Sequence, residues 1–114
     1  MVRIANNENF DVPKYESMAA IAESGDPNEA NKAAFSIGSY VKEYGFDIDY
    51  APVADVNTNP ENIVIGPRAF SDDPETAAKF VVSYLNGLDS AGVIGTLKHF
   101  PGHGSTVQDS HDGY

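Results

Sequence analysis

The chain has 114 residues, a length typical of one domain and far below the roughly 250 residues of a complete eight-stranded α/β barrel. Its 17 acidic and 7 basic side chains give a formal charge of -10, which disfavours nucleic acid and anionic membrane surfaces as partners. The chain has no cysteine, which excludes disulfides, thiolate-bound zinc and thiol nucleophiles. Its apolar stretches are all far shorter than a membrane span.

The first part of the chain carries weak structural signals. Residues 1–13 are expected to form an irregular or extended lead-in, and they lack the basic, apolar and small-residue zones of a signal peptide. Pro13 fits the first turn of a short helix over residues 14–23, which is rich in alanine and which Gly25 ends. The compartment in which the protein works stays open.

A better-specified helix follows. Asp26 is suited to the N-cap, Pro27 to the first helical position, and Glu29 completes a capping-box pattern. Gly45 is suited to end this helix, and the apolar segment 46–53 after it predicts a buried strand. The apolar positions of the helix recur at a helical period, at Ala30, Ala33, Ala34, Ile37, Tyr40, Val41 and Tyr44.

The same order then repeats. A long loop over residues 55–72 leads to a second helix, which Asp73 and Pro74 open and Gly92 ends. Residues 93–98 predict another buried strand, and a glycine-rich loop completes the chain. The apolar positions of this helix are Ala77, Ala78, Val81, Tyr84, Leu85 and Leu88.

The order helix, glycine, strand and long loop occurs twice. This repeated order predicts an α/β architecture with parallel strands. In such folds the chemistry lies on the loops that follow the carboxyl ends of the strands. The two long loops hold all three histidines of the chain. Their polar residues, which mark the candidate site, are Asp55, Asn57, Arg68, Lys98, His99, His103, Asp109 and His111.

The last loop carries the most informative motif. Lys98 and His99 lie at the end of the predicted strand and begin the run Lys-His-Phe-Pro-Gly-His-Gly, after which Asp109 and His111 follow two residues apart. In an extended loop the side chains of residues i and i+2 point the same way. Asp109 is therefore placed to accept a hydrogen bond from His111, fix its tautomer and stabilise its cation, as in an acid–base pair.

These motifs resemble glycoside hydrolase family 3, in its β-N-acetylhexosaminidase branch. The run over residues 98–111 is the specific part of the resemblance. Two further segments resemble the same family: Ile-Gly-Pro-Arg-Ala-Phe-Ser-Asp-Asp-Pro over residues 65–74, and Phe-Asp-Ile-Asp-Tyr-Ala-Pro-Val-Ala-Asp over residues 46–55. The resemblance covers nearly the whole chain.

The resemblance implies a fold and a reaction. Residues 1–114 would be a segment of an N-terminal (β/α)8 TIM-barrel domain, from after its second strand through the acid–base loop. The reaction would be hydrolysis with retention, through an aspartate nucleophile and a covalent glycosyl-enzyme intermediate. That nucleophile would lie beyond Tyr114, so the fragment itself is expected to be inactive. No cofactor and no metal are implied.

The resemblance also assigns roles to residues of this chain. His111 would be the acid–base residue and Asp109 its partner, in place of a carboxylic acid. A neutral base beside an anionic intermediate avoids like-charge repulsion. The residues that would bind the sugar are Arg68, Lys98, His99 and Arg3. Ser105 and Pro67 are small departures from the family pattern.

Other interpretations of these side chains stay open. His99, His103, Asp109 and His111 offer nitrogen and oxygen ligands to a metal, although their spacing is that of a loop. His103 is expected to be structural, with its ring bonded to the loop backbone. Asp47 and Asp49 are expected near the start of a strand, and Asp55 is expected to orient a neighbouring loop or Arg68.

Three functions compete. The first is a hydrolase that removes terminal β-linked N-acetylglucosamine in peptidoglycan or amino-sugar turnover, and the second is a phosphorylase of the same branch. The third is a non-catalytic sugar-binding or assembly module. A partial barrel also leaves strand edges unpaired and apolar faces uncovered, so the fragment is expected to self-associate.

Overall fold

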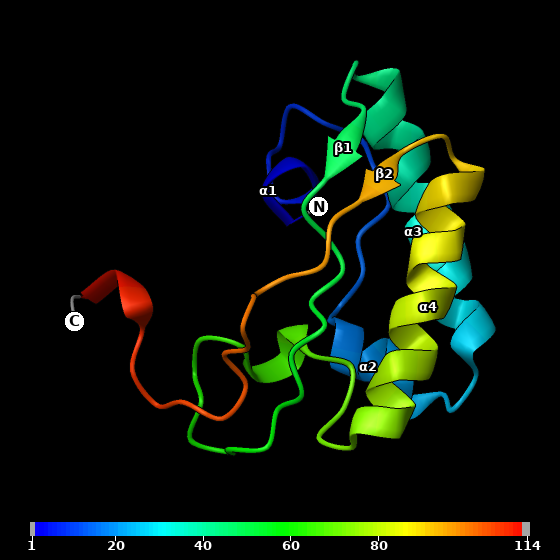
Figure 1. The fold of residues 1–114 in the computed structure, drawn as a ribbon. Coiled ribbons are helices and arrows are strands. Elements are labelled where there is room, and N and C mark those ends of the chain that lie inside the picture. Colours follow the sequence, from blue (N-terminus) through cyan, green and yellow to red (C-terminus); the bar gives the residue numbers. More distant parts are fainter. Residues whose placement is uncertain (1, 113–114) are drawn as a thin grey trace.

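The structure is a computed structural model that describes residues 2–112. Two long helices lie side by side against a short parallel sheet (Figure 1). A long loop follows each of the two strands. The elements in chain order are α1 (Val2–Ala5), α2 (Met18–Glu23), α3 (Pro27–Glu43), β1 (Ile48–Asp49), η1 (Gly66–Arg68), α4 (Pro74–Ser90), β2 (Ile94–Gly95) and η2 (Ser110–Asp112).

Both long helices begin where the sequence predicts. The Asp26 carboxylate accepts a hydrogen bond from the Asn28 N–H at 3.0 Å, and the Asp73 carboxylate accepts one from the Thr76 N–H at 2.8 Å. These bonds satisfy amides that have no partner within the helix. Gly45 adopts a φ of 88° directly after α3, a conformation that glycine tolerates and that ends the helix.

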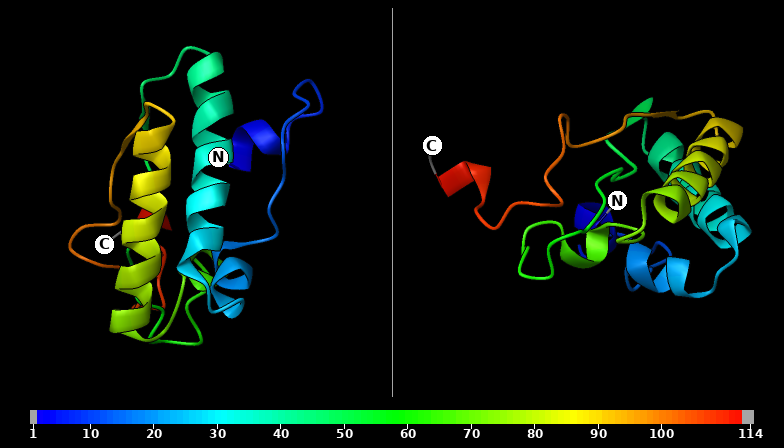
Figure 2. Two further views of the ribbon diagram at one scale, coloured as in Figure 1. Left: turned by 90° about the vertical axis from the view of Figure 1, so that its right-hand side faces the viewer. Right: turned by 60° about the horizontal axis from the view of Figure 1, so that its bottom comes forward.

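The two helices pack along their length (Figure 2). Gly87 of α4 sits so close to α3 that a Cβ there would overlap the Asn31 carbonyl oxygen and lie 2.7 Å from the Ala34 Cβ. The apolar stripes are confirmed apart from Tyr44 and Ala78, which are exposed. The main core consists of Ala30, Ala34, Ile37, Tyr40, Val41, Phe70, Phe80, Val81, Tyr84, Leu88 and Val93.

The strands are parallel, as predicted, but much shorter than predicted. Ile48 pairs with Ile94 and Asp49 with Gly95, and further along Val53 forms an isolated parallel bridge with Lys98. The predicted strands over 46–53 and 93–98 are therefore wrong in length. Within residues 2–112 each strand has one neighbour, so no second ladder holds the flanking residues in a regular sheet.

The expectation that segment 46–53 is buried is also only half right. Phe46, Ile48 and Tyr50 are exposed, whereas Asp49 and Val53 are buried. Successive side chains of a strand point to opposite faces. The long helices α3 and α4 lie on one side of the sheet, and on the side of β1 away from them Figure 1 shows the short helix α1. The exposed apolar residues belong to the face that α3 and α4 leave open.

The beginning of the chain differs from prediction. Residues 2–5 form the short helix α1 in place of an extended lead-in, and α2 begins at Met18, four residues later than the predicted start. The Ser17 hydroxyl accepts the Ala20 N–H at 3.0 Å, so a serine cap fixes this start. No helix among the described residues is long and apolar enough to cross a bilayer.

Candidate active site

Asp55 organises the loop that follows β2. It lies just after the Val53 bridge and is 4% exposed. One carboxylate oxygen accepts the His99 backbone N–H at 3.1 Å and contacts His99 Nδ1 at 2.7 Å, while the other accepts the His103 backbone N–H at 2.6 Å. Burial alone would raise the pKa of Asp55, but these hydrogen bonds outweigh it and hold the pKa below its usual value. The prediction that Asp55 orients a neighbouring loop is confirmed.

Asn62 is a second anchor, and sequence reasoning missed it. It is 3% exposed, its amide nitrogen donates to the His103 carbonyl, and its oxygen accepts the N–H groups of Val64 and Ile65 at 3.0 and 2.9 Å. One side chain thus joins the loop after β1 to the loop after β2. The available signal was an asparagine directly before the apolar run Ile-Val-Ile, a position where Asn caps a turn.

The two loops also touch through their backbones. A Cβ on Gly104 would overlap the Val56 carbonyl oxygen, and the Asn59 N–H donates to the Gly104 carbonyl at 3.2 Å. Only glycine permits this approach. The last glycine of the Lys-His-Phe-Pro-Gly-His-Gly run is therefore required by packing.

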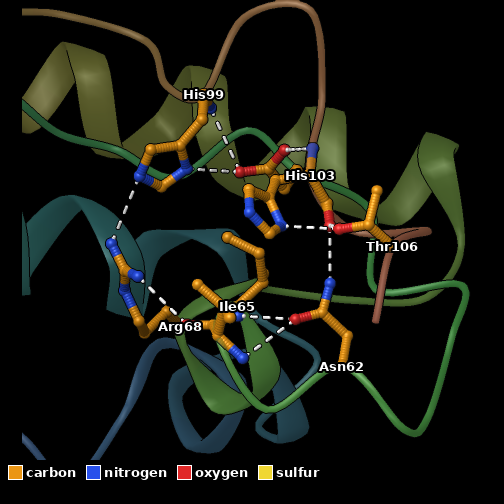
Figure 3. Close-up of polar contacts among 8 residues, drawn as sticks. Asn62, Ile65, Arg68, His99, His103 and Thr106 are labelled. Carbon is orange, nitrogen blue, oxygen red and sulfur yellow. Dashed lines mark hydrogen bonds and ion pairs between the residues drawn. The ribbon is translucent and has the colours of Figure 1, made fainter. Parts of the chain in front are cut away.

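Arg68 and His99 come together, as Figure 3 shows. Arg68 ends η1, where one guanidinium nitrogen donates to the Val64 carbonyl at 3.1 Å. The other terminal nitrogen lies 3.4 Å from His99 Nε2. Two of the residues predicted to bind a ligand, from loops 31 positions apart, thus form one polar group.

Lys98 stands beside this group. Its backbone carbonyl accepts the Ala54 N–H at 2.7 Å, which ties the two loops at their base. Burial of the half-buried side chain, reinforced by the positive charge of Arg68, lowers the pKa of Lys98. An open pocket of about 500 Å³ lies here, and its lining includes Asp55, Lys98 and His99.

His103 is held as a structural residue, but not in the predicted manner. The expectation was a ring bonded to the loop backbone. The ring Nδ1 instead lies 2.8 Å from the Thr106 hydroxyl, and it is the backbone of His103 that Asp55 and Asn62 bind. Thr106 also donates to the His103 carbonyl at 3.0 Å, so the contact closes a tight local turn.

Asp109 and His111 contact each other. His111 Nδ1 lies 2.6 Å from the Asp109 carboxylate, and the same oxygen accepts the His111 backbone N–H at 2.9 Å. Hydrogen bonds from the His111 backbone and ring lower the pKa of Asp109. The local backbone is the 3-10 turn η2 rather than the extended loop expected. Figure 1 shows η2 apart from the rest of the described chain, and the His111 side chain is 87% exposed.

The remaining candidates lie elsewhere. Asp47 forms an exposed ion pair with Lys42 at 2.6 Å, and Asp49 is buried in β1. Arg3 belongs to α1, and its side chain lies outside the part of the chain that the structure describes. Among residues 2–112 no three His, Cys, Asp or Glu side chains are gathered closely enough to hold a metal ion.

Known proteins are similar to this chain in sequence and in fold. A profile described as the glycosyl hydrolase family 3 N terminal domain matches residues 9–114. A β-hexosaminidase of Stenotrophomonas maltophilia is 39% identical over 105 residues, covering 89% of this chain and 30% of the relative. The β-hexosaminidase LpqI of Mycobacterium tuberculosis is 40% identical over 97 residues, covering 85% of this chain and 25% of the relative.

Solved structures that resemble this chain include proteins of the same family. The family 3 β-N-acetylglucosaminidase of a Paenibacillus species matches with a TM-score of 0.85 and 40% identity, over 88% of this chain and 19% of that one. A β-glucoside phosphorylase, BglX, matches with a TM-score of 0.84 and 29% identity, over 89% of this chain and 18% of that one. The chain thus spans less than a third of the length of these proteins, and its helices and parallel strands are a segment of their TIM-barrel-like fold. With 106 of its residues inside the family profile, the chain belongs to glycoside hydrolase family 3.

Proposed function

We propose that residues 1–114 are a segment of the N-terminal barrel domain of a retaining β-N-acetylhexosaminidase. Its substrate would be a glycan with a terminal β-linked N-acetylglucosamine, in peptidoglycan or amino-sugar turnover. The observation that carries the proposal is the 2.6 Å contact between His111 Nδ1 and the Asp109 carboxylate. The names of the relatives, which are β-hexosaminidases and a β-N-acetylglucosaminidase, support the substrate class.

The pair suits a proton-transfer role in both halves of a retaining reaction. Nδ1 faces Asp109, so Nε2 is the nitrogen that faces outward and carries the transferred proton. In the first half His111 donates this proton to the oxygen of the departing group, and in the second it takes a proton from the attacking water. Asp109 stabilises the imidazolium that is present before the first transfer and again after the second. No residue of this segment is assigned the nucleophile, and the 114-residue chain alone is expected to be inactive.

The sugar is proposed to bind at the mouth of the pocket. Lys98 and His99 line this pocket and Arg68 contacts His99, so these three residues would bind the sugar, and Arg3 is proposed as a fourth contact. Because Figure 1 shows η2 apart from the rest of the described chain, the proposal requires the acid–base turn to move toward the pocket when a sugar binds.

A test on the full-length protein that carries this segment uses a chromogenic β-N-acetylglucosaminide. His111→Ala is expected to lower kcat by roughly 100- to 10,000-fold, the usual contribution of an acid–base residue. Thr106→Val is the control, because Thr106 contacts His103 and not the pair. Undiminished turnover by His111→Ala would remove this residue from the mechanism, and absence of turnover in the unmodified protein would favour a sugar-binding module.

A phosphorylase is the second candidate, because a β-glucoside phosphorylase, BglX, is among the structural matches. A neutral histidine tolerates an anionic acceptor better than a carboxylate does, so the same pair suits transfer to phosphate. The identity to BglX is 29%, however, against 39% and 40% to the β-hexosaminidases. Product analysis with and without phosphate separates the two, since only a phosphorylase forms a sugar 1-phosphate.

The open face of the sheet is proposed to bind a second copy of the 114-residue chain. Ile48 of β1 and Ile94 of β2 are paired across the sheet and both are exposed, and Phe46 and Tyr50, two residues before and after Ile48, are exposed as well. An uncovered apolar face next to an unpaired strand edge favours association.

A further inference from the structure

The His99 ring is held from both sides. Nδ1 lies 2.7 Å from the Asp55 carboxylate, and Nε2 lies 3.4 Å from a terminal nitrogen of Arg68 (Figure 3). Both partners belong to the segment between β1 and α4, where Asp55 precedes η1 and Arg68 is its last residue. Each ring nitrogen therefore has one fixed partner, and the chemistry of that partner decides which nitrogen carries the hydrogen.

On the Asp55 side the ring must donate. The carboxylate is ionised at neutral pH, since its pKa is lowered, and an ionised carboxylate only accepts hydrogen bonds. The same oxygen already accepts the His99 backbone N–H at 3.1 Å. Two N–H groups of one residue thus converge on one oxygen, which fixes the rotation of the ring.

On the Arg68 side the ring must accept. A guanidinium has five N–H donors and no acceptor, so it favours an unprotonated nitrogen opposite it. We infer that Asp55 is a positioning residue that holds His99 as the Nδ1–H tautomer, with Nε2 turned toward Arg68 as a hydrogen-bond acceptor. The hydrogen bonds thus link the Asp55 carboxylate to the His99 imidazole and the imidazole to the Arg68 guanidinium.

The tautomer limits what His99 does in the pocket. This step rests on the proposed function. Nε2 has one lone pair, which faces Arg68, so a sugar hydroxyl that donates to Nε2 takes the place of this 3.4 Å contact, whereas a carbonyl oxygen finds no donor there. An acetamido carbonyl is therefore directed to the donors of Arg68 and Lys98. Asp55 does not touch the sugar, and its effect on binding passes through His99.

Nitrogen NMR reads the tautomer directly. The 114-residue chain labelled with 15N-histidine gives three imidazoles, and magic-angle spinning records them whatever the size of an assembly. At alkaline pH, where imidazoles are neutral, His99 is expected to show a protonated Nδ1 and an unprotonated Nε2. A His99→Gln variant assigns the signals. An Nε2–H tautomer for His99 in the unmodified chain would overturn the inference.

Two variants test the cause. Asp55→Ala removes the acceptor of Nδ1 and is expected to let an Nε2–H form of His99 appear beside the Nδ1–H form. Thr106→Val is the matched control, because it removes the side-chain partner of His103 and is expected to leave His99 unchanged. A His99 that stays entirely in the Nδ1–H form in Asp55→Ala would refute the positioning role. Should that variant unfold, the tautomer of the unmodified chain still decides.

Kinetics of the full-length protein separate this inference from the proposed function. Asp55→Ala is expected to raise KM by roughly tenfold, the effect of one misplaced hydrogen bond, with a smaller loss in kcat. A correct tautomer in a protein that turns over no glycoside would refute the proposed function alone. A wrong tautomer in an active hydrolase would refute the inference alone.

Discussion

At the scale of single residues, two buried carboxylates experience opposite environments. Asp55 is surrounded by N–H donors, which lower its pKa in spite of burial. Asp49 is 3% exposed, and its Oδ2 has no hydrogen-bond partner. Burial raises the pKa of Asp49, and the charge of Lys98 offsets this only in part. The first carboxylate stabilises the fold as an anion, whereas the second opposes it.

Asp49→Asn is therefore expected to stabilise the chain at neutral pH, because it removes a buried charge whose pKa is raised by burial. A raised folded-state pKa means that the contribution of Asp49 to stability is fully present below the unfolded-state pKa. It is lost as the pH rises through the folded-state pKa. The gain from Asn should accordingly vanish in acid.

Urea unfolding at neutral and at acid pH measures this difference. Asp47→Asn is the control, because Asp47 is exposed and pairs with Lys42, so its removal is expected to bring no gain. Equal stability of Asp49→Asn and the unmodified chain at neutral pH would contradict the argument.

At the scale of elements, the contact between α3 and α4 depends on small residues. Gly87 meets the backbone of Asn31, and Gly38 meets Ala91, whose Cβ would lie 2.7 Å from a Cβ on Gly38. A backbone atom cannot rotate away as a side chain does. The spacing of the helix pair, and with it the position of both strands, is therefore set by these glycines.

Gly87→Ala is expected to destabilise the chain by about 1–3 kcal/mol through overpacking. This exceeds the gain of up to about 1 kcal/mol that alanine brings to a helix interior. Asn86→Ala, at the exposed neighbouring position of the same helix, is the control and should be neutral or slightly stabilising. Thermal unfolding followed by circular dichroism compares the two, and a higher Tm for Gly87→Ala would show that the helices separate at no cost.

At the scale of the whole molecule, the helices protect one face of the sheet and leave the other open. The principal extents are 36, 32 and 22 Å, so the chain is flattened, with its long loops spread beside the helix pair. Ile48 is 49% exposed on the open face, and Phe35 is equally exposed on α3. Substitutions at these two positions therefore distinguish association through the open face of the sheet from association caused by any exposed apolar side chain.

Sedimentation of the 114-residue chain is expected to give a species larger than a monomer. Ile48→Lys should shift it toward monomer, because a charge on the open face must lose its water when two copies meet. Phe35→Lys should leave the distribution unchanged. A monomeric unmodified chain, or equal effects of the two variants, would contradict association through the sheet.

Local signals predicted the helices well and the strands poorly. Asp26 and Asp73 act through the next turn of their own helices, so the pattern around each cap contains the cause. Strand length depends on neighbours that are remote in sequence, and this is why the strand predicted over residues 46–53 is longer than the observed β1. The Asp109–His111 contact is local and was predicted, whereas Asn62 acts on His103, 41 positions away, and carried no comparable signal.

The anchors of the site hold main-chain groups, and this bears on how the loop changes over evolution. Asp55 accepts a hydrogen bond from the backbone N–H of His103, and Asn62 donates one to its backbone carbonyl. Both backbone groups are present whatever side chains the loop carries. Phe100, 99% exposed, and Ser105, also exposed, lie on that loop without bearing on either anchor. New side chains at these two positions would alter the rim of the pocket while its scaffold persists, so specificity is free to diverge without loss of the fold.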